Sequence, residues 1–310
     1  MIDVSVVMSV YDQPEHVRVT VDSVLAQQGI EFEFIIVSDG ASEEVHHVLN
    51  TYQDTRIKIV EQKNQGLTKA LIKGCDLAQA PFIARIDAGD VMMKSRLAQQ
   101  KEVLQTQSDV VIVSSWVRMQ TEEGYFLYDV KLNECELNHG LKSSNEDEIK
   151  TPVHSSVMFR KSAYHQAGGY RPEFYFSQDC DLWARMINLG SLAVIQQPLT
   201  VNVFSPFGIS GMYSHIQLKM KKLVALMNEL RDQSKSEKEV LFEAEKLRPS
   251  NQMKKTHVKE NKFSGFYFIA KILSNNKSPY AADYWQRALK EKPLSLKSWF
   301  MYLKFSLSRY

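Results

Sequence analysis

This 310-residue chain has few cysteines, little net charge and no long apolar run. Its three cysteines, Cys75, Cys135 and Cys180, lie far apart, so neither a disulfide framework nor a cysteine-rich metal site is expected. A formal net charge of +2 gives no support to binding of nucleic acid through bulk charge. No apolar run approaches the roughly 20 residues that a membrane-spanning helix needs, and the N-terminus lacks the basic segment of a signal peptide. We therefore expect a cytoplasmic protein that does not bind nucleic acid.

Short β-branched segments alternate with amphipathic helical patterns over the first two hundred residues. Hydrophobic residues make up 44% of the chain and charged residues 24%, which is sufficient for a large buried core. Strands are predicted at residues 4–10, 32–37, 57–60, 82–86, 110–113 and 192–195. Helices are predicted at 14–28, 42–52, 67–78, 97–105 and 177–189. This alternation predicts βαβ units and a mostly parallel sheet.

Local signals define several element ends. Asp12 and Glu15 form a capping-box pattern with Pro14 in the first helical turn, and Ser42 can cap the next helix. The polar stretch 133–150 predicts a loop or an excursion over the active face, and 151–160 returns to strand-like character. Beyond residue 211 helical patterns dominate, at 215–230, 237–247, 280–289 and 294–310, with a polar basic stretch at 248–262. We expect a catalytic domain over 1–212 and a helical C-terminal extension over 213–310.

Polar side chains follow four successive strands. They are Tyr11 and Asp12, then Asp39, then Asn64, and finally Asp87 with Asp90. In parallel α/β sheets ligands bind beyond the carboxyl ends of the strands. These side chains are therefore expected to converge on one crevice.

The segment Arg85-Ile86-Asp87-Ala88-Gly89-Asp90 places two carboxylates just past a buried strand. Carboxylate oxygens together with substrate phosphates suit a hard divalent cation such as Mg²⁺ or Mn²⁺. Taken alone, the segment fits a solvated turn or a helix cap equally well.

Two further acidic segments are candidates for a site. In Gln178-Asp179-Cys180-Asp181, a carboxylate at the mouth of a crevice suits a general base that activates a hydroxyl. Asp181 could instead cap the following helix, and Asp179 could be a surface acid. In Val37-Ser38-Asp39-Gly40, the acid fits a hydrogen bond to a nucleotide base or ribose, or a plain turn.

The order of the motifs is more specific than any one of them. The series VSVVMSVYD, IIVSDGAS, NQGLTKALIKGCDLA, FIARIDAGD, HSSVMFRKS, GGYRP and QDCDLWARM resembles the family 2 inverting glycosyltransferases, over about residues 4–190. The resemblance implies an α/β GT-A fold, a Rossmann-like mixed sheet of nucleotide-diphospho-sugar transferases, here with a helical C-terminal extension. It implies transfer of a sugar, with inversion, from a nucleoside-diphosphate sugar, most often a uridine one. The acceptor would be a saccharide or lipid-linked saccharide in cell-surface polysaccharide synthesis.

The resemblance also implies roles for individual residues. Asp179 matches the catalytic base, and His154 and Gln178 lie on the acceptor side. Asp87 and Asp90 would hold Mn²⁺ or Mg²⁺. The nucleotide-sugar pocket would be formed by Val10, Tyr11, Asp12, Asp39, Gly66, Lys69, Arg85, Asp87 and Ala88.

This chain departs from the family pattern at two positions. Gly89 stands where the third acid of Asp-Ala-Asp-Asp is usual, so either Asp90 replaces it as metal ligand or metal dependence is weak or absent. Gln178 stands where an acid usually precedes the base, and loss of that like charge should lower the proton affinity of Asp179. Both departures are compatible with a second hypothesis, a non-catalytic glycosyltransferase-like binding subunit.

The two ends of the chain bear on competing interpretations. A sugar-nucleotide pyrophosphorylase would have a glycine-rich loop after the first strand, whereas this chain reads MSVYDQPEH there. The C-terminal segment 294–310 mixes apolar and aromatic residues with lysines, which is typical of an interfacial helix on anionic lipid. It fits equally a helix packed on the catalytic domain.

Overall fold

The computed structural model describes residues 2–205, 214–248 and 258–307. The chain forms two compact units, each assembled from separate segments. Unit 1 comprises Met1–Val117, Val130–Asn202 and Leu218–Arg248, and unit 2 comprises Arg118–Asp129, Val203–Gln217 and Pro249–Tyr310. The predicted domain boundary between residues 212 and 213 lies outside the described residues.

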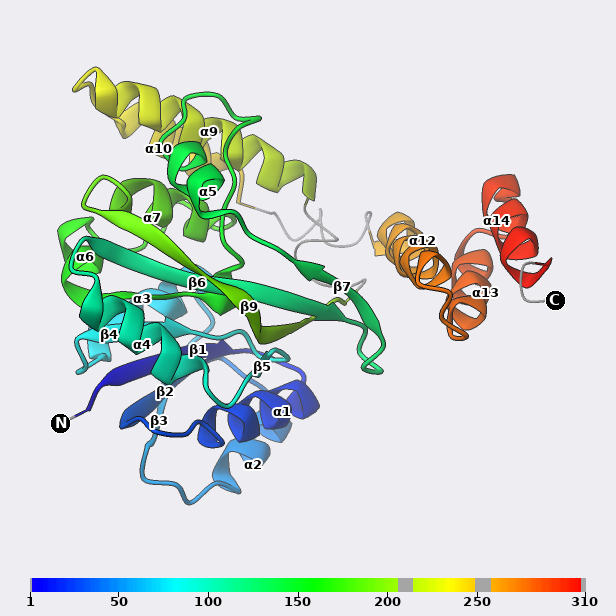
Figure 1. Ribbon diagram of the computed structural model, residues 1–310, viewed down its shortest axis with the longest axis horizontal. Helices are drawn as coiled ribbons and strands as arrows, with labels where there is room; N and C mark the ends of the chain where they lie inside the picture. Colours follow the sequence, from blue (N-terminus) through cyan, green and yellow to red (C-terminus); the bar gives the residue numbers. More distant parts are fainter. Residues whose placement is uncertain (1, 206–213, 249–257, 308–310) are drawn as a thin grey trace. The chain divides into compact units, whose positions relative to one another are not determined.

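A mixed β-sheet forms the centre of unit 1 (Figure 1). The strand order is β3-β2-β1-β4-β8-β6-β9-β5, and β7 pairs with β6. Strands β1 to β4 are parallel, whereas β8 lies antiparallel between β4 and β6. The predicted α/β mixed sheet is confirmed. The bounds are β1 Val4–Val10, β2 Phe32–Asp39, β3 Ile57–Gln62, β4 Phe82–Arg85, β5 Val91–Met92, β6 Val110–Gln120, β7 Phe126–Val130, β8 Met158–Arg160 and β9 Ser191–Val203.

Helices cover both faces of this sheet (Figure 1). Successive strand residues point to opposite faces, so Val6 and Met8 join one apolar cluster while Val7 joins the other. The first cluster contains residues of α1 (Pro14–Leu25), α2 (Glu43–Asn50) and α4 (Arg96–Thr106). The second contains residues of α3 (Leu67–Leu77), α5 (Glu134–Gly140), α6 (Lys161–Gln166) and α7 (Gln178–Met186). Because the β-branched strands are buried on both sides, their sequences show no polar alternation.

Two local expectations are wrong. Helix α1 has Gln13 as its N-cap, with φ 67° and no side-chain cap hydrogen bond, so the capping box is not formed. Asp12 instead accepts a hydrogen bond from the Gln13 backbone N–H. Within the predicted loop 133–150, α5 forms and Asn133 caps it by accepting from the Glu136 N–H. The polar sequence hid this short helix because tertiary packing of Leu137, rather than a long apolar stripe, stabilises it.

Helices α9 (Ser214–Asp232) and α10 (Lys238–Lys246) confirm the patterns predicted there. The part of α9 within unit 1 buries Met220, Val224 and Met227. Its Asn228 amide donates hydrogen bonds to the carbonyls of Leu141 and Ser143, which ties the segment after α5 to α9.

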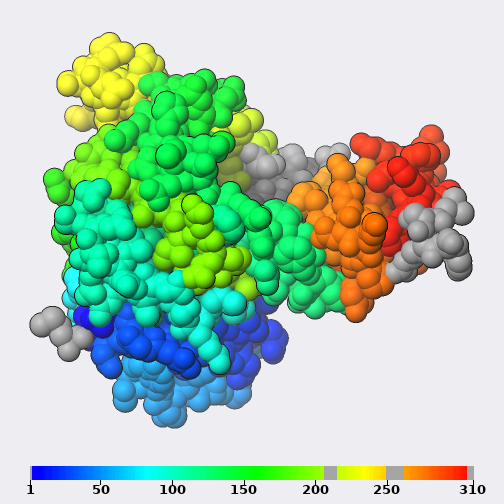
Figure 2. Space-filling view, viewed as in Figure 1, coloured from blue at the N-terminus to red at the C-terminus, as the bar shows by residue number. Residues whose placement is uncertain are grey.

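In the space-filling view, the blue surface of the first strands and helices and the teal-to-green surface of later unit 1 segments meet directly (Figure 2).

Unit 2 contains three helices among its described residues, namely α12 (Val258–Asn275), α13 (Ala281–Glu291) and α14 (Leu296–Leu307). Trp285 of α13 is fully buried and donates from its indole nitrogen to Ser274 of α12 at 2.8 Å. Arg287 forms an ion pair of 2.8 Å with Glu123 of the β6–β7 connection. Of the polar basic stretch 248–262, residues 258–262 belong to α12, and 249–257 lie outside the described residues.

Candidate active site

The ends of β1 and β2 form one part of the site. Val10 pairs with Ser38 in register, so Tyr11 and Asp39 follow side by side at the same edge of the sheet. The Tyr11 side chain is exposed, as is Asp12. An exposed aromatic side chain beside a strand end offers a surface for a planar base.

Asp39 organises the loop that follows β3. It is buried, and its carboxylate accepts hydrogen bonds from the Gln62 side chain and from the backbone N–H groups of Gln65 and Gly66, each at 2.8 Å. These three bonds fix the loop between β3 and α3 against the end of β2. Any contact of Asp39 with a nucleotide base would therefore be made by a carboxylate that the loop already orients.

Gly66 is required by the packing of this loop. Its φ is 92°, and a Cβ atom there would lie 2.8 Å from the Tyr175 ring. The Arg248 guanidinium lies over the same ring, 5.1 Å from its centroid, and donates to the Gln65 carbonyl. Lys69, one helical turn further on, is exposed.

Arg85 is the buried cation of the site. It ends β4, is fully buried, and donates to the Val7 carbonyl at 3.2 Å and to the Asp87 carboxylate. The Asp87 side chain remains 40% exposed. Burial disfavours the ionised form of Asp87, but the charge and hydrogen bond of Arg85 outweigh it, and its pKa is lowered below the usual range.

His154 lies beside this ion pair. It begins the short 3-10 helix His154–Ser156 just before β8, and its Nε2 forms a hydrogen bond of 2.7 Å with the Tyr170 hydroxyl. Burial, together with the charge of Arg85, lowers the pKa of His154 to about 3. The imidazole is therefore neutral at pH 7. The GGYRP motif contributes to the family resemblance, but no role for Tyr170 was predicted, and only the fold shows it to be the partner of His154.

Asp179 lies in the first turn of α7, close enough to Asp87 and Arg85 for the charges of both to affect its pKa. Burial raises the pKa of Asp179 to about 6, and the negative charge of Asp87 adds to this while the Cys180 backbone N–H opposes it. Gln178 beside it is buried. The structure thus brings together Arg85, Asp87, His154 and Asp179, and it places Asp39 at the same sheet edge, two strands away through β1.

Asp90 has a different environment from Asp87. It is 4% exposed, its carboxylate accepts from the Asn202 amide at 2.8 Å, and its carbonyl accepts from the Thr20 hydroxyl. Ala88, between the two acids, is partly buried against the first apolar cluster.

Arg96, a residue that sequence reasoning missed, fixes the segment before β8. It is fully buried and donates to the carbonyls of Ser155, Arg85 and Val157 at 2.6, 2.8 and 3.0 Å. Burial lowers the pKa of Arg96 to about 9. These bonds join the end of β4 to the turn that carries His154, so Arg96 holds the two halves of the site together.

The two acids predicted to bind a metal differ in their fit to that role. Within residues 2–205, 214–248 and 258–307, no three His, Cys, Asp or Glu side chains are grouped so that they could hold an ion. Mg²⁺ often takes only one or two carboxylates, with phosphates and waters completing the shell. The exposed carboxylate of Asp87 fits such a site, whereas Asp90 would first have to release Asn202.

Restoring an acid at position 89 is predicted to destabilise the protein. Gly89 has φ 101°, and a Cβ atom there would lie 3.2 Å from the His16 ring. A side chain in this backbone region costs about 1–3 kcal/mol, so Gly89→Asp should lower the free energy of unfolding by that amount in urea titrations. Gly124→Asp is the control, since its φ of 84° is similar but nothing lies within 4 Å. An equal loss in both variants would exclude a contribution from His16.

The mixed sheet, the helices on both faces and the acids at the strand ends define a GT-A glycosyltransferase. The chain belongs to glycosyl transferase family 2, whose sequence model matches residues 5–168. It is 31% identical over 189 residues to the O-antigen biosynthesis glycosyltransferase WbnJ of Escherichia coli, covering 60% of this chain and 72% of that protein. It is 28% identical over 197 residues to the amylovoran biosynthesis glycosyltransferase AmsE of Erwinia amylovora, covering 60% of this chain and 70% of the other.

Solved structures share the fold. The crystal structure of S. aureus TarS 1-349 in complex with UDP superposes with a TM-score of 0.54 and 12% identity, covering all of this chain and 93% of that one. The complex of the same protein with UDP-GlcNAc has the same TM-score and identity, covering 94% and 89%. At this level of identity the comparison shows the fold.

Proposed function

We propose that this glycosyltransferase moves a sugar from a uridine-diphosphate sugar to an acceptor hydroxyl, with inversion, and that Asp179 is the general base. The observation that carries the proposal is a carboxylate with a pKa of about 6 beside the Arg85–Asp87 pair. A base whose pKa lies near the working pH is largely ionised yet still accepts a proton effectively. This property supports a catalytic role over that of a non-catalytic binding subunit, which has no need of a tuned base.

The transfer would be a single displacement. Asp179 takes the proton of the acceptor hydroxyl while the acceptor oxygen forms a bond to the anomeric carbon. The bond from that carbon to the diphosphate oxygen breaks, and the nucleoside diphosphate leaves with the electron pair. Because the attack comes from the face opposite the leaving group, the configuration inverts without a covalent enzyme intermediate.

The other residues position the reactants in this proposal. Tyr11, Asp12 and Val10 border the nucleotide at the end of β1, and Asp39 orients the loop containing Gly66. The exposed ammonium of Lys69 suits contact with the phosphates. His154 is neutral and held by Tyr170, so it can exchange hydrogen bonds with a hydroxyl without adding charge.

Asp87 would hold a divalent cation together with the phosphates of the donor, with Asp90 as a further ligand if it releases Asn202. When bound, Mn²⁺ or Mg²⁺ would neutralise charge that develops on the leaving diphosphate. Arg85 keeps the Asp87 carboxylate ionised for this task.

The names of the relatives support polysaccharide assembly as the setting. WbnJ and AmsE are named for O-antigen and amylovoran biosynthesis, and the solved TarS complexes contain UDP and UDP-GlcNAc. We therefore expect a saccharide or lipid-linked saccharide acceptor and a hexosyl or N-acetylhexosaminyl donor.

Incubation with UDP-GlcNAc, UDP-GalNAc, UDP-Glc and UDP-Gal, each with Mn²⁺, Mg²⁺ or EDTA, tests the proposal. At least one donor should raise the melting temperature through mass action and release UDP in the presence of saccharide acceptors. The anomeric configuration of the product, measured by NMR, reports inversion. Donor binding without any UDP release would favour the non-catalytic subunit.

The pH dependence of kcat/KM should have an acid limb near pH 6. Asp179 must be ionised to take the proton, so activity is expected to fall about tenfold for each pH unit below its pKa of about 6. The groups that face it should not titrate there, because the pKa of Asp87 is lowered and that of His154 is about 3. Initial rates between pH 4.5 and 8 measure the profile. In Asp179→Glu the pKa of the carboxyl group is shifted, so the acid limb should move with it. An acid limb at the same pH in that variant would contradict the assignment.

The C-terminal helix carries an exposed apolar stripe. Leu296, Trp299, Phe300 and Leu303 have the i, i+3, i+4, i+7 spacing of one helix face, and all four are exposed. Leu296 is 85% exposed and Phe300 65%. Helix α14 also contains Lys297 and Lys304 and no acid. A basic helix with an apolar face suits the surface of an anionic bilayer, and among the described residues no helix is long and apolar enough to cross one.

Flotation with liposomes is predicted to reveal peripheral binding through α14. Vesicles with 30% phosphatidylglycerol should carry the full chain upward, and the triple change Leu296→Ser, Phe300→Ser and Leu303→Ser should reduce the bound fraction about tenfold or more. Phe242→Ser, a change at another exposed phenylalanine on α10, is the matched control. A membrane role would be contradicted if the triple variant floated with the vesicles to the same extent as the wild type, or if the wild type did not float at all.

A further inference from the structure

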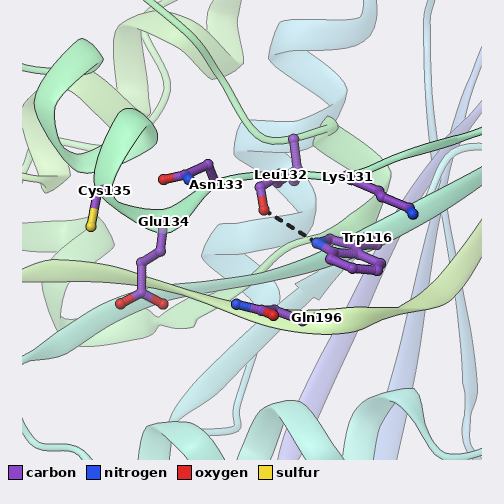
Figure 3. A pocket seen from close by; sticks show the side chains of 7 residues that line it. All are labelled: Trp116, Lys131, Leu132, Asn133, Glu134, Cys135 and Gln196. Carbon is purple, nitrogen blue, oxygen red and sulfur yellow. Dashed lines mark hydrogen bonds between the residues drawn. The ribbon is translucent and has the colours of Figure 1, made fainter.

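A pocket of about 530 Å³ lies outside the catalytic residues of unit 1. It is formed by Trp116 of β6, Gln196 of β9 and residues 131–135 before and within α5. Figure 3 shows the indole of Trp116 above Gln196, with Glu134 on the other side of the pocket. A broad aromatic ring and several amide and carboxylate groups thus line one pocket. None of these groups has a role in the proposed catalysis.

Trp116 is held in a fixed orientation. Its indole nitrogen donates to the Leu132 carbonyl at 3.2 Å, and Leu132 packs against the second apolar cluster (Figure 3). Lys131 lies over the ring, with its ammonium 5.3 Å from the ring centroid, and is itself exposed. A cation–π contact at an exposed site contributes only about 0.5–1 kcal/mol. A ligand can therefore displace Lys131 from the ring at little cost.

The strand register places Trp116 near the catalytic centre. Ala84 of β4 and Val113 of β6 both pair with Met158 of β8, and β4 and β6 run in the same direction. Asp87 and Trp116 each lie three residues beyond those positions, at the same edge of the sheet. The strands β4 and β6 themselves are two strand spacings apart, on the order of 10 Å.

Trp116 also lies on the same face of the sheet as the base. Its indole nitrogen donates to the Leu132 carbonyl, and Leu132 packs against the second apolar cluster, to which Leu137 of the neighbouring helix α5 belongs. Leu182 and Trp183 of α7 belong to that cluster as well, and α7 begins with Gln178 and Asp179. The turn that carries His154 lies between the two strands, because Ser156 forms a hydrogen bond with Ser114 of β6. The pocket therefore lies on the same face of the sheet as α7 and close to the turn that carries His154, the residue assigned to the acceptor side in the proposed mechanism.

We propose that this pocket is an acceptor subsite, in which Trp116 stacks on a sugar residue of the acceptor that precedes the one receiving the new bond. The C–H face of a pyranose packs well on an indole ring, and its hydroxyl groups need both donors and acceptors. Gln196 supplies both, and Glu134 and Asn133 supply further polar atoms at the rim. This inference rests on the proposed glycosyl transfer. It adds a binding site that discriminates long acceptors from short ones and that is separate from the donor site.

Cys135 provides a direct probe of occupancy. It lines the pocket and is exposed, whereas Cys75 and Cys180 are buried. Alkylation of Cys135 by N-ethylmaleimide, followed by intact mass, should slow at least fivefold with one of chitotetraose, cellotetraose or maltotetraose. Trp116→Ala should abolish this protection and Trp116→Phe should keep most of it. Protection by none of the three saccharides, equal protection in Trp116→Ala, or protection by UDP alone would overturn the proposal.

Kinetics separate the subsite from the catalytic machinery. Trp116→Ala should raise KM about tenfold for a tetrasaccharide acceptor, with KM for the donor and for a monosaccharide acceptor unchanged. Equal KM changes for short and long acceptors would indicate a merely structural role. If the wild type releases no UDP from any donor, the proposed function fails, and the alkylation experiment still decides whether the pocket binds saccharide.

Discussion

Replacement of Asp179 by Asn is expected to reduce sugar transfer by about 10²- to 10⁴-fold, the usual contribution of a general base. The amide has the same size as the carboxylate but cannot take the proton of the acceptor hydroxyl. Donor affinity should change little, because Asp179 faces the acceptor side of the Arg85–Asp87 pair in the proposed mechanism. UDP release under saturating donor and acceptor measures the loss, and the thermal shift with donor measures binding.

The stability of the same variant tests the environment of the carboxyl group. Its pKa is raised from 3.8 to about 6 on folding, so Asp179 favours the fold below its unfolded pKa, and this contribution is lost as pH rises through 6. At pH 7 the neutral amide avoids the cost of a partly buried charge. Asp179→Asn should therefore melt at the same temperature as the wild type or higher. A variant that kept near-normal turnover, or lost both turnover and fold, would refute this role.

The opposite result is expected for Asp181, two residues further along α7. Asp181 is fully buried, accepts from Arg185 at 2.6 Å and lies 3.6 Å from Arg171. Arg171 in turn pairs with Glu237 of the α10 N-terminus at 2.6 Å. Removal of one partner from a buried ion pair leaves an uncompensated charge and costs about 3–5 kcal/mol. Asp181→Asn should lower the free energy of unfolding by that amount.

Urea denaturation measures this loss, with Asp147→Asn, a change at an exposed acid, as the control. Adding Arg185→Met to Asp181→Asn should return part of the stability, since it removes a cation that would otherwise lose its counter-ion. Donor-dependent transfer by the folded fraction of Asp181→Asn should remain measurable. A loss below 1 kcal/mol would show that water reaches this network and compensates the charge.

The contrast between these two acids shows where sequence reasoning ends. Both lie in one acidic segment, and from the residues alone Asp181 could be a helix cap and Asp179 a surface acid. The structure places Asp179 toward the Arg85–Asp87 pair and buries Asp181 against two arginines. The partners of Asp181 come from sequence positions as distant as Glu237, so the sequence assigned the role of base to Asp179 only through the family resemblance and gave no sign of the buried ion pairs of Asp181.

The same limit applies to the other elements of the site. The strands predicted at 32–37 and 82–86 end within two residues of the observed ends at Asp39 and Arg85, because buried β-branched segments and polar residues after them are local features. The helix α5 and the contacts of Arg96, Tyr170 and Asn202 could not be predicted, since each depends on a partner more than ten residues away.

By itself, the sequence determined the main strands and helices of the first two hundred residues, from β1 to α4 and again at α7, and the order in which its acids follow those strands. Periodicity and β-branched composition act within a few residues, so they can be seen without the fold. Tertiary structure alone decided that β8 enters antiparallel between β4 and β6, which brings His154 beside Asp87 and places β6, with Trp116, next to the turn that carries His154. Burial and neighbouring charge then set the pKa of each acid, and both depend on atoms that only the folded chain brings together.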